Sequence, residues 1–150
     1  RPGASADGRY YNMAGADISS ACSAAEHYLA LANCPTIAIG DGGNEVGMGN
    51  VVTALSSLNI QPAVSTVDEL IVADVSNWAA YALCALTDWL SGHTSDSMTL
   101  CHGDLERLVA RGAIDGVTRE PTATEDGFPF SDTTALISDV AQLLSKGHVA

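Results

Sequence analysis

A glycine-rich segment in the first half of the chain constrains the fold more than any other feature. Five of the ten residues from Gly40 to Gly49 are glycine, and they follow a short apolar, β-prone run at residues 36–39. A helical segment is expected next, at about residues 51–58. A strand, a glycine loop and a helix in that order are typical of the ligand-binding edge of an open α/β sheet. The segment therefore predicts an α/β fold with a binding loop after its first strand.

The rest of the chain extends this pattern. A second buried strand is expected at residues 70–73, and helices at about residues 19–32, 78–90, 104–110 and 130–146. A weaker β-prone run at 116–120 is a candidate third strand. Strands that alternate with helices indicate parallel βαβ units, so we expect one Rossmann-like three-layer α/β sandwich with parallel strands over residues 1–150.

The expected sheet is small. Two or three strands fall short of the usual five or six, and a parallel sheet needs cover on both faces. We therefore expect a partial sheet that is completed by another chain or by an N-terminal half missing from this one. The sequence begins at Arg1 rather than methionine, which fits a processed product or the C-terminal part of a longer protein.

The charge balance argues against several function classes. Six Lys and Arg residues against eighteen Asp and Glu residues give a net charge of −12. Because phosphate backbones and anionic membrane surfaces are bound by clustered cations, neither nucleic acid nor a membrane is an expected partner. Lys146 is the only lysine, which argues against Schiff-base chemistry and against a nucleotide phosphate loop.

Cysteine usage and hydropathy indicate the compartment. The four cysteines are Cys22, Cys34, Cys84 and Cys101. They form no C-x-x-C pair and no spacing typical of secreted proteins, so we expect reduced, buried thiols. The longest apolar stretch, at residues 78–86, is far shorter than the ~20 residues that span a bilayer, and we expect no signal peptide. A cytoplasmic protein is expected, or one of the mitochondrial matrix if the source is eukaryotic.

The glycine loop does not follow the common nucleotide-binding patterns. A dinucleotide loop that starts at Gly40 would need glycine where Glu45 stands, and a phosphate loop that starts at Gly42 would need lysine where Met48 stands. A carboxylate inside the loop would also repel a phosphate. The structural alternative is a turn that needs the left-handed conformations of glycine. We favour a binding loop because the segment carries more polar side chains than a turn requires.

A second candidate loop follows the second expected strand. Asp74, Ser76 and Asn77 lie near its carboxyl end, as Asp41 does after the first strand. Parallel neighbours open both loops on one edge of the sheet, so Asp41, Glu45 and Asp74 are expected to share a crevice with two helix N-termini. Helix N–H groups favour an anion, whereas carboxylates favour an ammonium group or a hard metal ion such as Mg²⁺ or Mn²⁺. This combination predicts a small zwitterionic substrate. For Ser76 and Asn77 the structural alternative is that they only cap the N-terminus of the following helix.

The opening segment, residues 1–16, is an unusually polar and aromatic loop. It is either a solvated tail or a substrate-side loop that folds over the crevice. In the second case the binding residues are Asp7, Tyr10, Tyr11 and Asn12. The remaining substrate-binding candidates are Gly42, Gly43, Asn44, Gly47, Met48, Gly49, Ser76 and Asn77. For Trp78 and Tyr81, packing in the core is the favoured role.

Glu45 is expected to face the ligand, because it lies inside the glycine loop among residues too small to shield it. The nearby Asp41 carboxylate would then raise the pKa of Glu45 toward a value useful for a base. The structural alternative is that Glu45 accepts loop N–H groups and holds the turn.

Three motifs together resemble a known family. They are Gly40-Asp-Gly-Gly-Asn-Glu-Val-Gly-Met-Gly-Asn-Val51, Val72-Ala-Asp-Val-Ser-Asn-Trp-Ala-Ala-Tyr-Ala-Leu83, and Arg1-Pro-Gly followed by Asp7-Gly-Arg-Tyr-Tyr-Asn-Met13. In content and order they resemble the C-terminal domain of D-glutamate cyclases over residues 1–90. Family members tend to carry glycine where Asp74 stands and lysine where Asn50 stands. The resemblance also implies a further N-terminal half of the domain before the Arg-Pro-Gly motif.

The resemblance implies a hydro-lyase in which the amine of D-glutamate attacks its own γ-carboxyl group, giving 5-oxo-D-proline and water. Such a reaction needs a base for the ammonium group, a curled substrate and a neutralised carboxyl group. Loop amides are suited to the carboxylate and the developing oxyanion. Glu45 and Asp41 are the catalytic candidates, one as base and the other as orienting group or ligand of a divalent ion.

Two other functions stay open. One is a non-catalytic binding module for a small amino dicarboxylate, and the other is a related enzyme that acts on another small carboxylate. The metal-ligand candidates are Asp41, Glu45 and Asp74, with Mg²⁺ or Mn²⁺ as the ion. The expected partners are a small amino dicarboxylate and either further copies of this chain or a complementary N-terminal chain.

Overall fold

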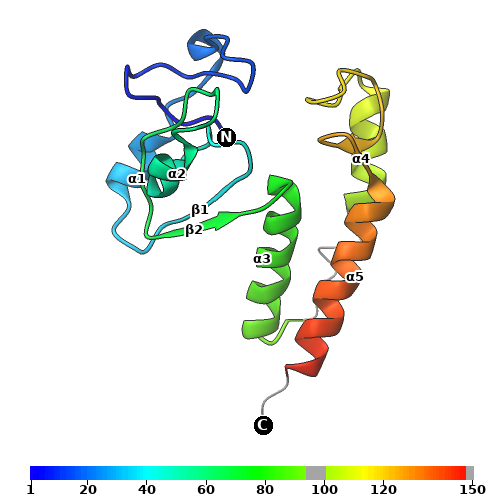
Figure 1. Ribbon diagram of the computed structural model, residues 1–150. Helices are drawn as coiled ribbons and strands as arrows, with labels where there is room; N and C mark the ends of the chain where they lie inside the picture. Colours follow the sequence, from blue (N-terminus) through cyan, green and yellow to red (C-terminus); the bar gives the residue numbers. More distant parts are fainter. Residues whose placement is uncertain (94–100, 148–150) are drawn as a thin grey trace. The chain divides into compact units, whose positions relative to one another are not determined.

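The computed structural model describes residues 1–93 and 101–147 (Figure 1). The chain divides into two compact units, a first unit of Arg1–Ser76 and a second unit of Asn77–Ala150. The fold is mixed α/β, as predicted, with a two-stranded parallel sheet in the first unit and a two-stranded antiparallel sheet in the second. The three-layer Rossmann-like sandwich stays a prediction. Among the described helices, none combines the length and the apolar character that crossing a membrane would require.

The parallel sheet confirms both predicted strands. β1 (Ile37–Gly40) lies beside β2 (Glu69–Val72) in unbroken register, with Ile37 opposite Glu69 and Gly40 opposite Val72. The parallel orientation brings the loops that follow the two strands to the same edge of the sheet. This is the arrangement that the candidate site requires.

The other side of β1 is open in the part of the chain that is described. The carbonyl groups of Thr36 and Gly40 accept hydrogen bonds from the β2 side. Because backbone groups alternate in direction along a strand, those of Ile37 and Ile39 point to the opposite side, where no described strand pairs with β1. Ile37 is 53% exposed there. Completion of this edge by another chain stays a prediction.

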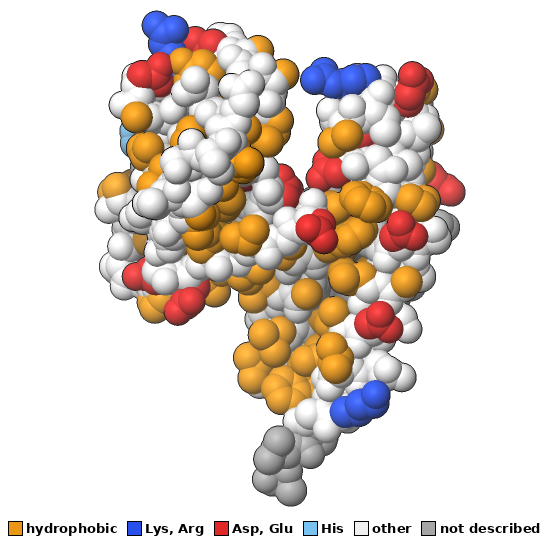
Figure 2. Space-filling view, viewed as in Figure 1, with side chains coloured by type: hydrophobic (Ala, Val, Ile, Leu, Met, Phe, Trp, Pro, Cys, Tyr) orange, Lys and Arg blue, Asp and Glu red, His pale blue; other side chains and the backbone are white. Residues whose placement is uncertain are grey.

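An apolar groove lies beside the open edge. Its volume is about 340 Å³, and it is lined by Arg1, Ala25, Tyr28, Leu29, Ile37, Ala38, Ile39 and Val46. The core of the first unit is thin, because among the described residues only Met48, Ala63 and Val75 are its buried apolar side chains. Large apolar side chains, in contrast, are exposed in both units, and Figure 2 shows many of them at the surface.

Two helices of the first unit are shorter than predicted. The expected helix at 19–32 is divided into η1 (Ser19–Ala21) and α1 (Glu26–Leu31), and the one at 51–58 becomes η2 (Met48–Val51) and α2 (Val52–Leu55). Their apolar spacing is helical, but serine side chains compete for backbone hydrogen bonds, and β-branched residues lose side-chain freedom in a helix. Both segments are rich in one or the other.

The second unit contains three longer helices and a hairpin. The helices are α3 (Ser76–Leu90), α4 (Cys101–Ala110) and α5 (Phe130–Lys146), and the hairpin is β3 (Thr124–Glu125) with β4 (Phe128–Pro129). All three helices were predicted, and Gly92, shortly after the end of α3, has a φ of +69° that suits the end of a helix.

The candidate strand at 116–120 is wrong, because the chain turns at residues 116–118. The cause is Asp115, whose carboxylate accepts hydrogen bonds from the N–H groups of Val117 and Thr118 at 2.8 Å each. It also accepts the Thr124 hydroxyl at 2.7 Å and the Gly127 N–H at 2.9 Å. One side chain thus folds the segment around itself, and a turn replaces the strand.

The prediction of buried thiols is also wrong for two cysteines. Cys34 and Cys84 are exposed, whereas Cys22 is half-buried. The side chain of Cys101 lies outside the described part of the chain.

Candidate functional site

The glycine loop leaves β1 at its carboxyl end and packs closely against the protein's own side chains. Gly47, at a φ of +93°, is in a left-handed conformation that other residues rarely adopt. A Cβ atom on Gly47 would lie 2.5 Å from the Cβ of Ala38, and one on Gly40 would lie 2.5 Å from Sδ of Met48. The space beside these two glycines is therefore filled from within the protein, so they serve close packing.

Several loop N–H groups already have intramolecular partners. Gly47 donates to the Ser65 hydroxyl at 3.1 Å, Gly49 to the Ser65 carbonyl at 2.9 Å, and Met48 to the Glu45 carbonyl at 3.1 Å. An external anion could use these groups only if the present bonds broke. For Gly47, Met48 and Gly49 the arrangement favours a structural role over the predicted contact with substrate.

Glu45 turns back onto its own loop. Its Oε2 accepts the Gly43 N–H at 2.8 Å, and its Oε1 accepts the Gly42 N–H at 3.3 Å. The residue is only 8% exposed. The expectation that Glu45 faces an open crevice is therefore wrong for this structure, because its carboxylate holds the turn instead.

The environment nevertheless changes the chemistry of Glu45. Burial is the main reason why the pKa of the Glu45 carboxyl group lies above its ordinary value. The Asp41 carboxylate raises this pKa further, whereas the loop amides act in the opposite direction. The direction of the shift agrees with the sequence-based expectation, but its largest cause is burial rather than the like charge.

Asp41 connects the two loops at the carboxyl edge of the sheet. Its Oδ2 accepts the N–H of Ser76 at 2.9 Å and also the Ser76 hydroxyl. Asp41 follows β1 and Ser76 begins α3, so the contact confirms that both loops meet at one edge. An acidic side chain at this position satisfies a free N–H group of the helix and complements its dipole.

The predicted metal ligands do not come together as a set. In the part of the chain that the structure describes, no three His, Cys, Asp or Glu side chains form a group able to hold a metal ion. Asp74 is exposed, whereas Glu45 is buried and bonded to its own loop. A requirement for Mg²⁺ or Mn²⁺ stays a prediction.

The opening segment reaches the glycine loop through its backbone. Gly3 donates its N–H to the Asn44 carbonyl at 2.7 Å, and Val46 donates to the Arg1 carbonyl at 3.0 Å. The buried Asn44 side chain donates to the Tyr11 carbonyl at 2.6 Å. The two segments are therefore neighbours, and Asn44 serves to join them.

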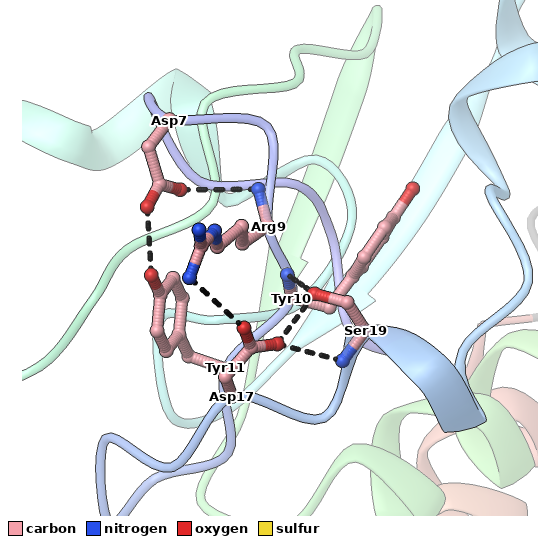
Figure 3. Close-up of polar contacts among 6 residues, drawn as sticks. All are labelled: Asp7, Arg9, Tyr10, Tyr11, Asp17 and Ser19. Atoms are coloured by element: carbon pink, nitrogen blue, oxygen red, sulfur yellow. Dashed lines mark hydrogen bonds and ion pairs between the residues drawn. The ribbon is translucent and has the colours of Figure 1, made fainter.

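Several polar groups of the opening segment bond to neighbours within residues 7–19 (Figure 3). The Tyr11 hydroxyl donates to Asp7 at 2.7 Å, and Arg9 forms an ion pair with Asp17 at 3.3 Å. The hydrogen bond from Tyr11 lowers the pKa of Asp7 and raises that of Tyr11. Asn12 accepts N–H groups from its own turn. These local contacts favour a structural role for Asp7, Tyr11 and Asn12 over the predicted contact with substrate.

Tyr10 belongs to a separate contact. Its hydroxyl donates to Oε2 of Glu26 at 2.9 Å, and Oε1 of Glu26 accepts the Ala4 N–H at 2.5 Å. Glu26 lies in α1, so this pair holds the opening loop to that helix.

A second buried glutamate, Glu125, was not among the residues that the sequence singled out. It is 5% exposed and accepts hydrogen bonds from the Asn77 amide at 2.8 Å and the Tyr81 hydroxyl at 2.6 Å. The Thr133 hydroxyl donates to it at 2.5 Å and accepts the Trp78 indole N–H at 2.9 Å. Asn77 is thus committed to Glu125, and Trp78 and Tyr81 are polar anchors as well as packing residues. The one hint in the sequence was the Asp-Gly turn that follows Glu125.

Known proteins match the chain along most of its length. The sequence model of the family described as "D-glutamate cyclase-like, C-terminal" matches residues 1–141. One relative, "D-glutamate cyclase, mitochondrial" of Homo sapiens, is 38% identical over 95 residues. That match covers 57% of this chain and 15% of the human protein, so the chain corresponds to a small part of that relative.

Proposed function

The chain belongs to the D-glutamate cyclase-like C-terminal family, and we propose that it cyclises D-glutamate to 5-oxo-D-proline. In this reaction the amine nitrogen forms a bond to the γ-carboxyl carbon. One oxygen of that carboxylate leaves as water, and both protons of this water come from the nitrogen, which changes from an ammonium group to an amide N–H. The protein must therefore accept a proton, hold the substrate curled and assist the departure of oxygen.

The observation that carries the proposal is the position of Glu45. It is a buried carboxylate with a raised pKa, near Asp41, at the carboxyl edge of a parallel strand pair. A base is most effective when its pKa approaches the working pH, and burial moves Glu45 in that direction. Glu45 is accordingly the proposed base, and Asp41 the group that orients the amine while it holds Ser76.

The backbone supplies the proposed electrophilic assistance. The N–H groups of Gly42 and Gly43 converge on one carboxylate in the structure, that of Glu45. Fixed amides of this kind stabilise negative charge that develops on an oxygen, because they need no reorganisation during the reaction. The proposed roles require Glu45 to leave these amides when substrate binds.

The alternative is a binding module without catalysis, and the burial of Glu45 within its own loop favours it. Titration calorimetry with D-glutamate, followed by NMR detection of 5-oxoproline in the same sample, separates the two. The measurement includes L-glutamate as a control and arms with added Mg²⁺, Mn²⁺ or a chelator. Formation of 5-oxoproline from the D enantiomer supports the enzyme. Binding without product supports the module, and the absence of both contradicts the proposal.

A further inference from the structure

We propose that the N–H groups of Gly42 and Gly43 form a carboxylate-binding subsite, which the side chain of Glu45 fills until substrate arrives. The inference rests on the proposed function and deepens it, because it assigns the group that receives a substrate carboxylate. It also makes Glu45 an internal placeholder that the substrate displaces.

The geometry of the two amides defines the ligand class. Both N–H groups point at one carboxylate, at 2.8 Å from Gly43 and 3.3 Å from Gly42. Gly43 has a φ of +101°, and a left-handed residue in a turn lets successive N–H groups point into one concavity that binds anions. Ile60 and Leu55 pack against Gly43, which fixes this turn independently of Glu45. The site is thus already built for a carboxylate.

The occupant is held less firmly than a permanent structural carboxylate. Asp115, also buried, accepts four hydrogen bonds, and these lower its pKa far below the ordinary range despite burial. For Glu45 the balance is reversed, since burial and the Asp41 charge outweigh the amides and raise its pKa. The folded protein therefore disfavours the charged form of Glu45 where it now lies. A substrate with its own ammonium group would offset the negative charge of Asp41 beside these amides, which the Glu45 side chain cannot do.

Gly42 is only partly buried, so this end of the proposed subsite is close to solvent. The side chain of Met13 packs against Gly42, and Met13 is 49% exposed. Met13 is an unbranched, flexible side chain in a surface loop, so its displacement costs little packing. Once displaced by a substrate carboxylate, the Glu45 side chain stays tethered three residues away from Gly42, within reach of the substrate amine. One residue then acts first as placeholder and afterwards as base.

The test uses ¹⁵N NMR of the Gly42 and Gly43 amides during titration with acetate and with glutarate, a dicarboxylate that has no amine and cannot cyclise. The variant Glu45→Ala removes the internal carboxylate. We expect saturable shifts of both amides, with affinity at least about tenfold higher than in the wild type, because a tethered competitor has an effective concentration in the millimolar range or above. The Gly49 amide, which donates to Ser65, is the internal control and should not move. Sodium chloride at equal ionic strength controls for salt.

Two results overturn the inference: no saturable shift in a folded Glu45→Ala protein, or equal affinity in variant and wild type. If Glu45→Ala fails to fold, Glu45→Gln takes its place. Glutamine preserves the side-chain size but offers only one acceptor oxygen to the two amides. The affinity of Glu45→Gln for glutarate must then still exceed that of the wild type. If neither variant folds, the wild type decides, since glutarate binding that leaves both amides unmoved overturns the inference. Turnover of D-glutamate is measured separately. Product without carboxylate binding at these amides refutes the subsite alone, and binding without product refutes the proposed function alone.

Discussion

The two units each bury a glutamate, and they bind it in opposite ways. Glu45 in the first unit accepts N–H groups from residues two and three positions away. Glu125 in the second unit accepts side-chain donors from residues 48, 44 and 8 positions away, on α3 and α5. The two residues are almost equally exposed to solvent, Glu45 at 8% and Glu125 at 5%. The difference therefore lies in the sequence distance of the partners.

This difference separates a replaceable carboxylate from a fixed one. The partners of Glu45 belong to one short loop, which other contacts also hold, so Glu45 can leave without separating distant elements. The partners of Glu125 lie on α3 and α5, and its removal would leave donors on both helices without their partner, among them the buried Thr133 hydroxyl. Chemistry is expected at the first site and stability from the second.

The largest expected effect is the loss of catalytic turnover in the variant Glu45→Gln. Glutamine keeps the size and one acceptor but cannot take a proton, so turnover of D-glutamate should fall by about 10²-fold or more. Turnover and melting temperature are measured on the same preparation. Unchanged turnover with a lower melting temperature would assign Glu45 a purely structural role and remove the contrast between the two glutamates.

The next effect is on stability, in Glu125→Ala. Without the carboxylate, the donors of Asn77, Tyr81 and Thr133 lose their shared partner, and we expect unfolding to become easier by about 2–3 kcal/mol. Urea denaturation followed by circular dichroism measures this change, with Glu125→Gln as the matched control that retains one acceptor and should lose less. A stability equal to that of the wild type would show that Glu125 does not join the helices energetically.

A third effect is a pair of opposite pH dependences. The pKa of Asp115 is lowered in the folded state, so the stability it adds relative to Asp115→Asn is present above its unfolded pKa and is lost as pH falls. The pKa of Glu45 is raised, so its contribution relative to Glu45→Gln is fully present below its unfolded pKa and is lost as pH rises through the folded value.

Melting temperatures of the wild type and the two amide variants between pH 3 and pH 8 measure both trends. As pH falls, the advantage of the wild type should shrink over Asp115→Asn and grow over Glu45→Gln. If the advantage of the wild type over both variants changed in the same direction with pH, the pKa values of Asp115 and Glu45 would be shifted in the same direction, and the contrast between them would be wrong.

The smallest effects compare two tyrosine hydroxyl groups that donate to carboxylates. Tyr81 donates to the buried Glu125, whereas Tyr11 donates to Asp7 at the surface. Tyr81→Phe should lower the melting temperature measurably, and Tyr11→Phe should leave it nearly unchanged, because water replaces the lost partner. A higher KM for D-glutamate in Tyr11→Phe would instead support the substrate-side interpretation of the opening loop.

Local sequence patterns predicted the elements well where one signal dominated. The apolar runs before Gly40 and Asp74 predicted both parallel strands, and the helix predicted at about residues 130–146 is α5. The helix expected at 19–32 was wrong in extent, because periodicity does not reveal that serines compete for the backbone.

In the candidate site, too, the features that depend on local sequence could be predicted, whereas those that depend on side-chain packing could not. Asp41 and Glu45 could be singled out because they lie in a glycine loop after a strand, and the meeting of Asp41 with Ser76 followed from parallel pairing. The burial of Glu45 was missed, since it depends on a side chain folding back over two small residues. Glu125 was missed because its partners Asn77 and Thr133 lie 56 positions apart in the sequence, and no short motif records such a contact.

The pH dependence of D-glutamate cyclisation reports the protonation of the proposed base, Glu45, itself. Initial rates are measured for the wild type and for the residual activity of Glu45→Gln, with circular dichroism to confirm folding at each pH. We expect kcat/KM of the wild type to fall on acidification as Glu45 takes up a proton, with a midpoint above the ordinary carboxyl range. We also expect this acid limb to be missing in Glu45→Gln. An identical acid limb in both proteins would contradict the assignment of Glu45 as the base.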